Sequence, residues 1–288
     1  MRRALRVLAG AALLALAIWY ADPRALWRAL AGVDPWLFSA AVAVAVCSNF
    51  FCALRWSVIA RDLGLVSPFP SALLMYARGI TANMMLPGSV VSGDVLRSVQ
   101  LSQLGNPLAA SAWSVFLDRV SGLWILCAVS ALAAVGVALW RPEIPMLPGY
   151  AAILAAAFAI PLLPLPLPGT GRLGELAQGL RRSRPVLLSS GWYSCAVQCL
   201  AAGTLWLCGL SVGLSLPYPL MLAAAAPIFI MAALPIGIAG FGAREVAAVA
   251  VLGMAGVSGE QAFATGLLYG LAAVVQGIAA APLFFAKA

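Results

Sequence analysis

Two charged residues, Asp94 and Arg97, lie three positions apart in the stretch LPGSVVSGDVLR of an otherwise strongly apolar chain. Residues three apart share one face of a helix, so this carboxylate and this guanidinium can pair. The pair could simply support a helix start, with Ser92 as its N-cap. Alternatively, Arg97 and the backbone amides of the bend could bind a phosphate while Asp94 orients the arginine or accepts a proton. The solvent around this stretch decides how costly the charges are.

Composition places the chain in a membrane. Of its 288 residues, 64% are hydrophobic and only 9% are charged, whereas soluble domains carry about 25% charged residues. Charged side chains within a bilayer cost about 2.5–3.5 kcal/mol each on insertion scales and are typical of functional pathways, which favours the ligand-binding interpretation of Asp94 and Arg97. We therefore expect a single integral membrane domain over residues 1–288.

The chain has no histidine, which removes the commonest general base and the commonest metal ligand. Its cysteines lie in apolar runs without a CxxC pair, as expected for free buried thiols. They are Cys47, Cys52, Cys127, Cys195, Cys199 and Cys208. We expect no metal site and no cofactor.

Apolar stretches of the length needed to cross a bilayer occur at six places. They cover residues 5–20, 36–59, 112–140, 147–167, 186–210 and 262–285. The first follows Met-Arg-Arg and has a cleaved signal peptide as its alternative interpretation. Two more apolar regions, 71–104 and 219–253, are interrupted by Pro and Gly and read as pairs of half-length helices. The prediction is an all-α polytopic membrane protein with about six transmembrane helices and two broken re-entrant helical hairpins.

Arginine positions orient this arrangement, because short cytoplasmic loops collect positive charge. The arginines that place loops inside are Arg2, Arg3, Arg6, Arg172, Arg181, Arg182 and Arg184. If each hairpin returns to its own side, both termini are cytoplasmic in a bacterial-type inner membrane. The halves 1–140 and 141–288 then form an inverted-topology repeat, an architecture of transporters whose site lies at the repeat interface.

Further charges lie in the apolar segments. Arg78 and Asn83 precede the first break, Asp118 and Arg119 lie in a predicted span, and Gly242, Arg244 and Glu245 follow the second break. Asp118 and Arg119 point about 100° apart on a helix, so we expect each to pair with another element. Four arginines (Arg78, Arg97, Arg119, Arg244) face three acids (Asp94, Asp118, Glu245), which leaves one positive charge for an anionic head group.

Arg55 could join this set, although we expect it to snorkel to the cytoplasmic interface. Asn49, Gln100, Gln103 and Gln198 could line a polar path, but helix packing is the expected role of each one alone.

Three segments together carry a family resemblance: RGITANMMLPGSVVSGDVLRSVQL, LDRVSGL and LPIGIAGFGAREVA. In this order they resemble the flippase-like transmembrane domain of lysylphosphatidylglycerol synthetases and its stand-alone relatives. The resemblance covers most of the chain and implies movement of a lipid between leaflets. The positions that match its motifs are Arg78, Asn83, Pro87, Gly93, Asp94, Arg97, Asp118, Arg119, Gly242, Arg244 and Glu245. Ser92 stands where relatives often have glycine. The synthetases carry a soluble aminoacyl-transfer domain after the membrane part, so we expect no lipid aminoacylation from this chain.

The leading hypothesis is a lipid flippase that moves a phosphate-bearing lipid, anionic or zwitterionic, through a midplane arginine-lined cleft. The predicted substrate-binding residues are the motif positions except Pro87, together with Ser92. An accessory or scaffold role beside a lipid-modifying enzyme partner is the alternative. A membrane-embedded enzyme acting on lipid phosphates is a second alternative; isolated acids beside arginines speak against it, and we expect no enzyme. The net charge of +8 fits an anionic leaflet and not nucleic acid, because the arginines flank or lie within apolar segments.

Overall fold

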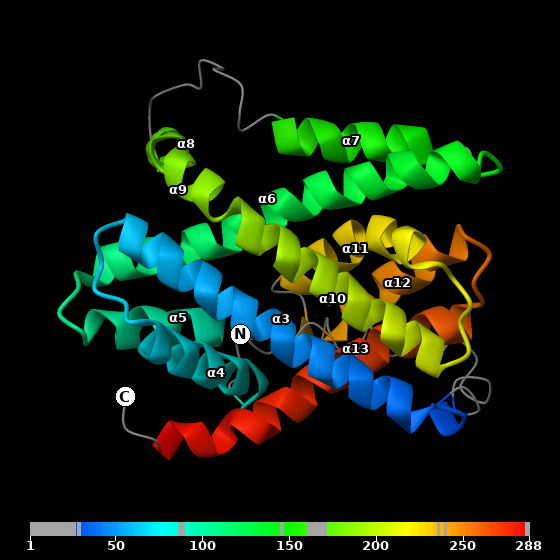
Figure 1. Cartoon of the computed structure of the whole chain (residues 1–288), viewed down its shortest axis with the longest axis horizontal. Helices are drawn as coiled ribbons and strands as arrows, with labels where there is room; N and C mark the ends of the chain where they lie inside the picture. Colours follow the sequence, from blue (N-terminus) through cyan, green and yellow to red (C-terminus); the bar gives the residue numbers. More distant parts are fainter. Residues whose placement is uncertain are drawn as a thin grey trace, which may run out of the picture.

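A computed structural model describes residues 27, 30–85, 90–144, 147–159, 172–234, 237–238 and 241–285. Helices dominate this part of the chain, and its strands, β1 (Gly237–Ile238) and β2 (Phe241–Gly242), form one short antiparallel pair. The helices, labelled as in Figure 1, are α3 (Pro35–Asp62), α4 (Phe69–Met85), α5 (Val90–Ser102), α6 (Leu108–Trp140), α7 (Leu147–Ala159), α8 (Arg172–Arg182), α9 (Arg184–Ser189), α10 (Gly191–Ser211), α11 (Tyr218–Ala233), α12 (Ala243–Gly253), α13 (Gly259–Ala280) and the 3-10 helix η2 (Ala281–Phe285). The predicted all-α fold class is confirmed.

Four of these elements are long and apolar enough to cross a membrane, namely α3, α6, α10 and α13 together with η2. They confirm the predicted spans 36–59, 112–140 and 262–285 as helices. The predicted span 5–20, with its signal-peptide alternative, lies outside the described residues.

The other two predicted spans differ from the structure in part. The helix α7 covers residues 147–159, and the rest of the predicted span 147–167 lies outside the described residues. The predicted span 186–210 is divided, because α9 ends at Ser189 and α10 begins at Gly191. Pro185 lies in the first turn of α9, where proline starts a helix, and Ser190 and Gly191 are weak helix formers at the junction. Of α9 and α10, therefore, only α10 has the length of a span.

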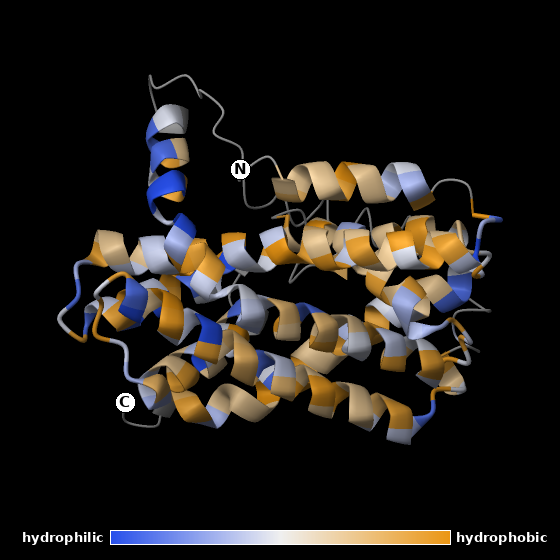
Figure 2. Ribbon diagram, turned by 45° about the horizontal axis from the view of Figure 1, so that its top comes forward, coloured by the Kyte–Doolittle hydropathy of each residue, from blue (hydrophilic) through white to orange (hydrophobic). Residues whose placement is uncertain are grey.

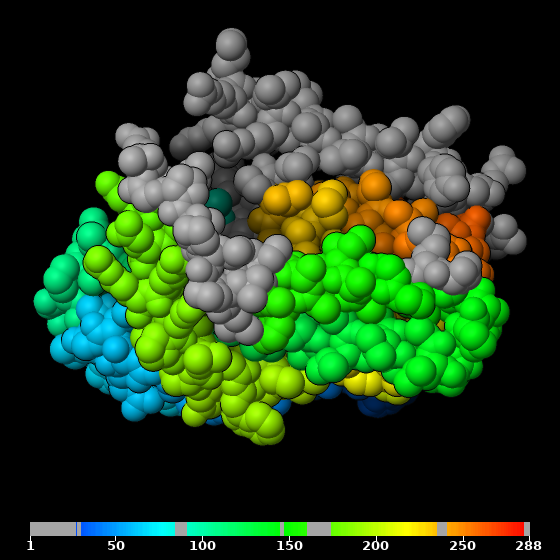
Figure 3. Space-filling view, turned by 90° about the horizontal axis from the view of Figure 1, so that it is seen from above, coloured from blue at the N-terminus to red at the C-terminus, as the bar shows by residue number. Residues whose placement is uncertain are grey.

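The long helices lie side by side in a flattened bundle (Figure 1). The most extensive contact between two helices joins α3 to α10, and α13 packs against both. The pair α6 and α7 covers one side, where their surfaces adjoin those of α8 to α10 (Figure 3). The pairs α4–α5 and α11–α12 lie at opposite ends of the long axis (Figure 1).

Small side chains let the helices approach closely. Ala134 of α6, Ala151 of α7 and Ala223 of α11 form one buried cluster, in the manner of helix contacts within membranes. Apolar residues run along the bundle, whereas hydrophilic ones concentrate on α8, which projects from it (Figure 2). The packing is that of a bundle whose surroundings are apolar.

The first broken pair consists of α4 and α5, with residues 86–89 between them outside the described part. The sequence predicted a bend over residues 88–93, but α5 already begins at Val90. Ser92 therefore lies within the first turn and is not the N-cap. The Asn83 side-chain oxygen of α4 accepts the Gly93 N–H in the first turn of α5 at 2.7 Å and so ties the two helices together.

The second broken pair consists of α11 and α12, with β1 and β2 in the connection. The predicted bend ended at Gly242, and α12 begins directly after it at Ala243, as predicted. Gly242 has a φ of 95°, a conformation that glycine adopts without steric cost. The re-entrant path of both pairs, and the inverted relation of the halves 1–140 and 141–288, stay predictions.

Candidate functional site: an ion-pair cluster beside a polar cavity

Asp118 of α6 joins two arginines from different helices. Its Oδ1 accepts from Arg55 Nε at 2.8 Å, and its Oδ2 accepts from Arg97 Nη1 at 3.0 Å. The Asp118 side chain is only 1% exposed. A buried carboxylate that accepts from two guanidinium groups is held both electrostatically and geometrically. Asp118 thus ties α3 and α5 to α6.

Asp94 extends this network toward the surface. Its Oδ1 accepts from Arg97 Nη2 at 3.0 Å, which confirms the predicted pair. Arg119 also donates to Asp94, from Nε at 3.0 Å to Oδ2 and from Nη2 at 2.9 Å to Oδ1. We call Arg55, Asp94, Arg97, Asp118 and Arg119 the five-charge cluster. With every member ionised, its three arginines and two aspartates leave one positive charge.

The helical rotation between neighbouring residues explains how α6 serves both ends of the cluster. Asp118 points to the buried arginines of α3 and α5, whereas Arg119 points to Asp94. The expectation that these neighbours pair with different groups is confirmed.

Aromatic rings fix Arg97 at the centre of the cluster. Its guanidinium carbon lies 4.8 Å from the centroid of Trp56 and 4.6 Å from that of Tyr76. Trp56 is itself held by a hydrogen bond from Nε1 to Ser114 Oγ at 3.2 Å. Stacking against two rings suits the planar guanidinium and leaves its edges free for the two carboxylates. Arg97 is therefore a preorganised cation.

A cavity of about 180 Å³ adjoins the cluster. Its lining residues are Asn49, Tyr76, Gly79, Ile80, Asn83, Gly93, Asp94, Arg97, Arg119 and Ala273. The side chains of Arg119 and Asp94 are 38% and 23% exposed, whereas those of Arg55, Arg97 and Asp118 are buried. The cluster thus has a closed half for support and an accessible half for a ligand.

One face of α4 forms much of the cavity wall. Tyr76, Gly79, Ile80 and Asn83 follow the i, i+3, i+4, i+7 spacing of a single helix face. On the facing helix, a Cβ added to Gly93 would overlap the Gly79 carbonyl oxygen and the Asn83 side chain. The absence of a side chain at Gly93 therefore lets α4 and α5 touch.

Polar side chains also connect α3 and α4 to α13. Asn49 donates to the Gln276 side-chain oxygen at 2.5 Å, and Thr81 donates to the Gly277 carbonyl at 2.8 Å. Asn49 thus makes the helix contact that the sequence led us to expect and lines the cavity as well. Gln198, by donating to the Gly122 carbonyl at 2.9 Å, also makes a helix contact.

The position of Arg55 differs from the prediction. It was expected to snorkel to the interface, but it is 4% exposed and bound to Asp118. Its Nη1 also lies 3.4 Å from Ser194 Oγ of α10. A buried acid on α6 holds the arginine inside the bundle, so the side chain does not extend to an interface.

The second broken pair holds its own ion pair. Arg244 donates to Glu245 Oε1, from Nε at 3.1 Å and from Nη2 at 2.6 Å. Glu245 Oε2 accepts the Gly242 N–H at 2.5 Å and so closes the start of α12. Gly270 of α13 makes room for this pair, because a Cβ there would collide with Arg244. Among the described residues, the ion pairs of Arg244 and Glu245 stay within this pair.

The predicted site residues therefore separate into groups. Asn83, Gly93, Asp94, Arg97 and Arg119 line the cavity, and Asp118 lies behind them. Three others, Gly242, Arg244 and Glu245, are not brought to this cavity, because they satisfy one another at the start of α12. Arg78 does not line it either and donates to the Leu283 carbonyl at 3.0 Å, and Ser92 lies in α5 outside the lining. The surplus positive charge lies in the five-charge cluster, which contains Arg55, whereas the prediction counted Arg78 and not Arg55.

Several residues of the site were not predicted. Tyr76, Gly79 and Ile80 were missed, although their spacing with Asn83 on one face of α4 is a usable signal. Trp56, Ala273 and Gln276 depend on how distant helices pack, and we find no signal for them in the sequence.

Residues 5–281 match the family described as the lysylphosphatidylglycerol synthase TM region. The chain belongs to this family. The matched residues include the five-charge cluster and both broken helix pairs. A comparison with curated proteins finds no match. As a member of this family, the chain is a multi-pass membrane domain related to lysylphosphatidylglycerol synthesis and to membrane lipid.

Proposed function

We propose that the chain moves a phosphate-bearing lipid between leaflets and binds the lipid head group in the cavity beside the five-charge cluster. The observation that carries this proposal is the surplus positive charge of the cluster. A ligand in the cavity can reach that charge, because Arg119 and Asp94 are the accessible members of the cluster and line the cavity. A phosphate monoanion would neutralise that charge. The cavity of about 180 Å³ is smaller than the roughly 300–1,000 Å³ of pockets for drug-sized ligands. Its size suits a head group whose tails stay in the bilayer.

Exchange of partners at Arg119 is the central step of the proposed mechanism. Arg119 donates from Nε and from Nη2 to the carboxylate of Asp94. Two phosphate oxygens can accept the same pair of donors, because guanidinium geometry fits carboxylate and phosphate alike. Asp94 keeps its bond to Arg97 meanwhile, and Asp118 keeps Arg97 in place. The lipid therefore competes with Asp94 without leaving a buried charge unpaired.

We further propose that both broken pairs are re-entrant hairpins and that residues 1–140 and 141–288 are inverted halves of one domain. The support is a shared construction, since each pair consists of helix, break and helix. In each, a polar side chain accepts a backbone N–H at the start of the second helix: Asn83 for Gly93, and Glu245 for Gly242. Rocking of such halves would expose a fixed site to either leaflet.

The projecting basic helix α8 supports a cytoplasmic-membrane location with both termini inside. Arg181 and Arg182 lie in its last turn, and short basic segments stay on the cytoplasmic side. Transport, and not catalysis, is the activity proposed here, and membrane lipid is the partner.

Leaflet exchange in proteoliposomes tests the proposal. Fluorescent phosphatidylglycerol, phosphatidylethanolamine and a polyprenyl phosphate are compared in wild type and Arg119→Ala. Arg141→Ala is the matched control, because Arg141 pairs with Glu143 in the connection between α6 and α7, outside the cavity. We expect exchange in wild type and the control, and its loss in folded Arg119→Ala. Folded wild type that exchanges none of these lipids would overturn the proposal and favour an accessory role beside a lipid-modifying enzyme.

A further inference from the structure

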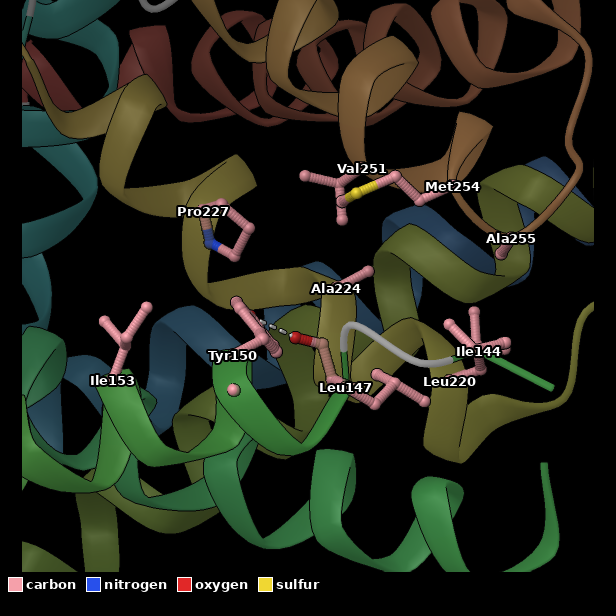
Figure 4. Close-up of a pocket in the computed structure, with 12 residues that line it drawn as sticks. Ile144, Leu147, Tyr150, Ile153, Leu220, Ala224, Pro227, Val251, Met254 and Ala255 are labelled. Atoms are coloured by element: carbon pink, nitrogen blue, oxygen red, sulfur yellow. Dashed lines mark hydrogen bonds between the residues drawn. The ribbon is translucent and has the colours of Figure 1, made fainter. Parts of the chain in front are cut away.

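A second cavity, of about 480 Å³, lies between α7, α11 and the end of α12 (Figure 4). In the part of the chain that the structure describes, it shares no lining residue with the polar cavity beside the five-charge cluster. Figure 4 shows Tyr150 and Ile153 on one wall and Pro227, Val251 and Met254 facing them. This cavity is a separate feature of the molecule.

A proline in α11 leaves one backbone carbonyl at this cavity without its helical hydrogen bond. Pro227 lies inside α11 and has no N–H, so the carbonyl of Ala223, four residues earlier, lacks its usual helical donor. The Tyr150 hydroxyl donates to that carbonyl at 2.7 Å (Figure 4). One hydrogen bond thereby satisfies both polar groups and joins α7 to α11.

The remaining wall of the cavity is apolar. Among the described residues, those that line the cavity carry no charged side chain, and the hydroxyl of Tyr150 is already bonded. A water molecule needs two to four polar partners in a buried site, and a lipid head group needs more. The occupant must therefore be a hydrocarbon group.

The rim of the cavity opens to the outer surface of the bundle. Ile153 is 70% exposed and Met254 is 51% exposed, although both line the cavity. The helix α7 packs along α6, which has the length and composition of a membrane span. We therefore expect bilayer hydrocarbon at this rim, and methionine adapts well to irregular apolar partners.

We infer that this cavity binds an acyl chain of a bilayer phospholipid, held between α7 and the second broken pair. Apolar burial drives the binding, because each buried methylene contributes about 0.8 kcal/mol. The volume of about 480 Å³ lies within the roughly 300–1,000 Å³ of pockets that bind small organic ligands. The inference does not depend on the proposed transport activity, since it rests on a different set of residues.

A photoreactive lipid tests the inference. The full chain is reconstituted in phosphatidylethanolamine vesicles that contain increasing fractions of a phosphatidylglycerol with a diazirine near one acyl terminus. After illumination, adducts are located by mass spectrometry. We expect adducts at Ile153 and Met254 to saturate at a low fraction of probe. Adducts at Leu132 and Leu139, exposed residues of α6, should rise in proportion to the probe.

Gly149 is a lining position at which a side chain can be added to reduce the space in the cavity. It lines the cavity, and a Cβ added there meets no atom within 4 Å. Gly149→Phe should lower adduct formation at Met254 by about tenfold, because it removes space for roughly two methylene groups. Gly136→Phe is the matched control: Gly136 lies on α6 outside the cavity, and a Cβ there likewise meets nothing within 4 Å.

Three outcomes would overturn the inference. The first is a linear rise at Ile153 and Met254, as for lipid that only surrounds the protein. The second is an unchanged adduct yield in folded Gly149→Phe. The third is the absence of adducts at both residues, which would show that protein covers the cavity. If Gly149→Phe fails to fold, the saturation curve of wild type alone decides between these outcomes and the inference.

Discussion

Arg119 holds Asp94 through hydrogen bonds from Nε at 3.0 Å to Oδ2 and from Nη2 at 2.9 Å to Oδ1, at the wall of the polar cavity. The same carboxylate accepts from Arg97, whose position is fixed by Asp118 and two rings. Asp94 is therefore the member of the cluster that can give up one arginine while keeping another. Substitutions at single members of the cluster distinguish this exchangeable role from the supporting roles.

Asp94→Asn should strengthen head-group binding and slow lipid exchange. The change removes the competitor of the phosphate and raises the surplus charge of the cluster from one to two, counted over its three arginines and the remaining Asp118. Binding of fluorescent phosphatidylglycerol and its leaflet exchange are measured in the same proteoliposomes. Glu143→Gln, which removes an acid outside the cavity, is the control. Faster exchange in Asp94→Asn would contradict the proposed competition.

Asp118→Asn should destabilise the fold more than any substitution at the accessible half of the cluster. It leaves Arg55 and Arg97 buried without their shared carboxylate, and breaking a buried ion pair costs about 3–5 kcal/mol. The measurement is the denaturant midpoint in detergent, with Asp94→Asn compared under identical conditions. Equal midpoints for the two variants would show that burial does not divide the cluster as described.

Gly93→Ala should separate α4 from α5 and abolish exchange. The added methyl group overlaps the Gly79 carbonyl and the Asn83 side chain, so the contact between the helices and the Asn83 hydrogen bond cannot both persist. Gly136→Ala is the control, because a Cβ there meets nothing within 4 Å. The control should gain up to about 1 kcal/mol from its higher helix propensity. Normal exchange by Gly93→Ala would refute the close packing of the first broken pair.

Tyr150→Phe should destabilise wild type by about 1–3 kcal/mol, because the Ala223 carbonyl then lacks a donor. In a Pro227→Ala background the helix supplies the missing N–H, so the same substitution should cost much less. A double-mutant cycle of unfolding free energies measures this coupling. Additive effects would mean that Tyr150 does not compensate for Pro227.

Local spacing predicted part of the site, and long-range packing determined the rest. The pair of Asp94 and Arg97 follows from positions three apart on a helix, and the divergence of Asp118 and Arg119 follows from helical rotation. The depth of Arg55 depends on where α3 crosses α6, which the pattern within one helix does not contain. For this reason its snorkelling was predicted wrongly.

For the fold, too, local properties were predicted correctly and features that depend on contacts between helices were not. Hydropathy and length identified α3, α6 and α13 as spans, because both properties are local. The hydrogen bond from Gly93 to Asn83 depends on how α5 packs on α4, and α9 separates from α10 at Ser190 and Gly191, which are weak helix formers. The charged residues of both broken pairs were predicted to belong to one binding site. In the structure, Glu245 instead binds the Gly242 N–H and the Arg244 side chain within the second pair.

The hydrogen bond between Gly93 and Asn83 also makes one backbone amide a reporter of motion. Its donor belongs to α5 and its acceptor to α4, so any separation of the two arms breaks this hydrogen bond and lowers the protection of the N–H in the first turn against exchange with solvent deuterium. Amides deeper in α5 keep their helical partners during such a movement and exchange only when the helix itself unfolds. The ratio of the two deuterium uptake rates therefore times the opening of the first broken pair without a label.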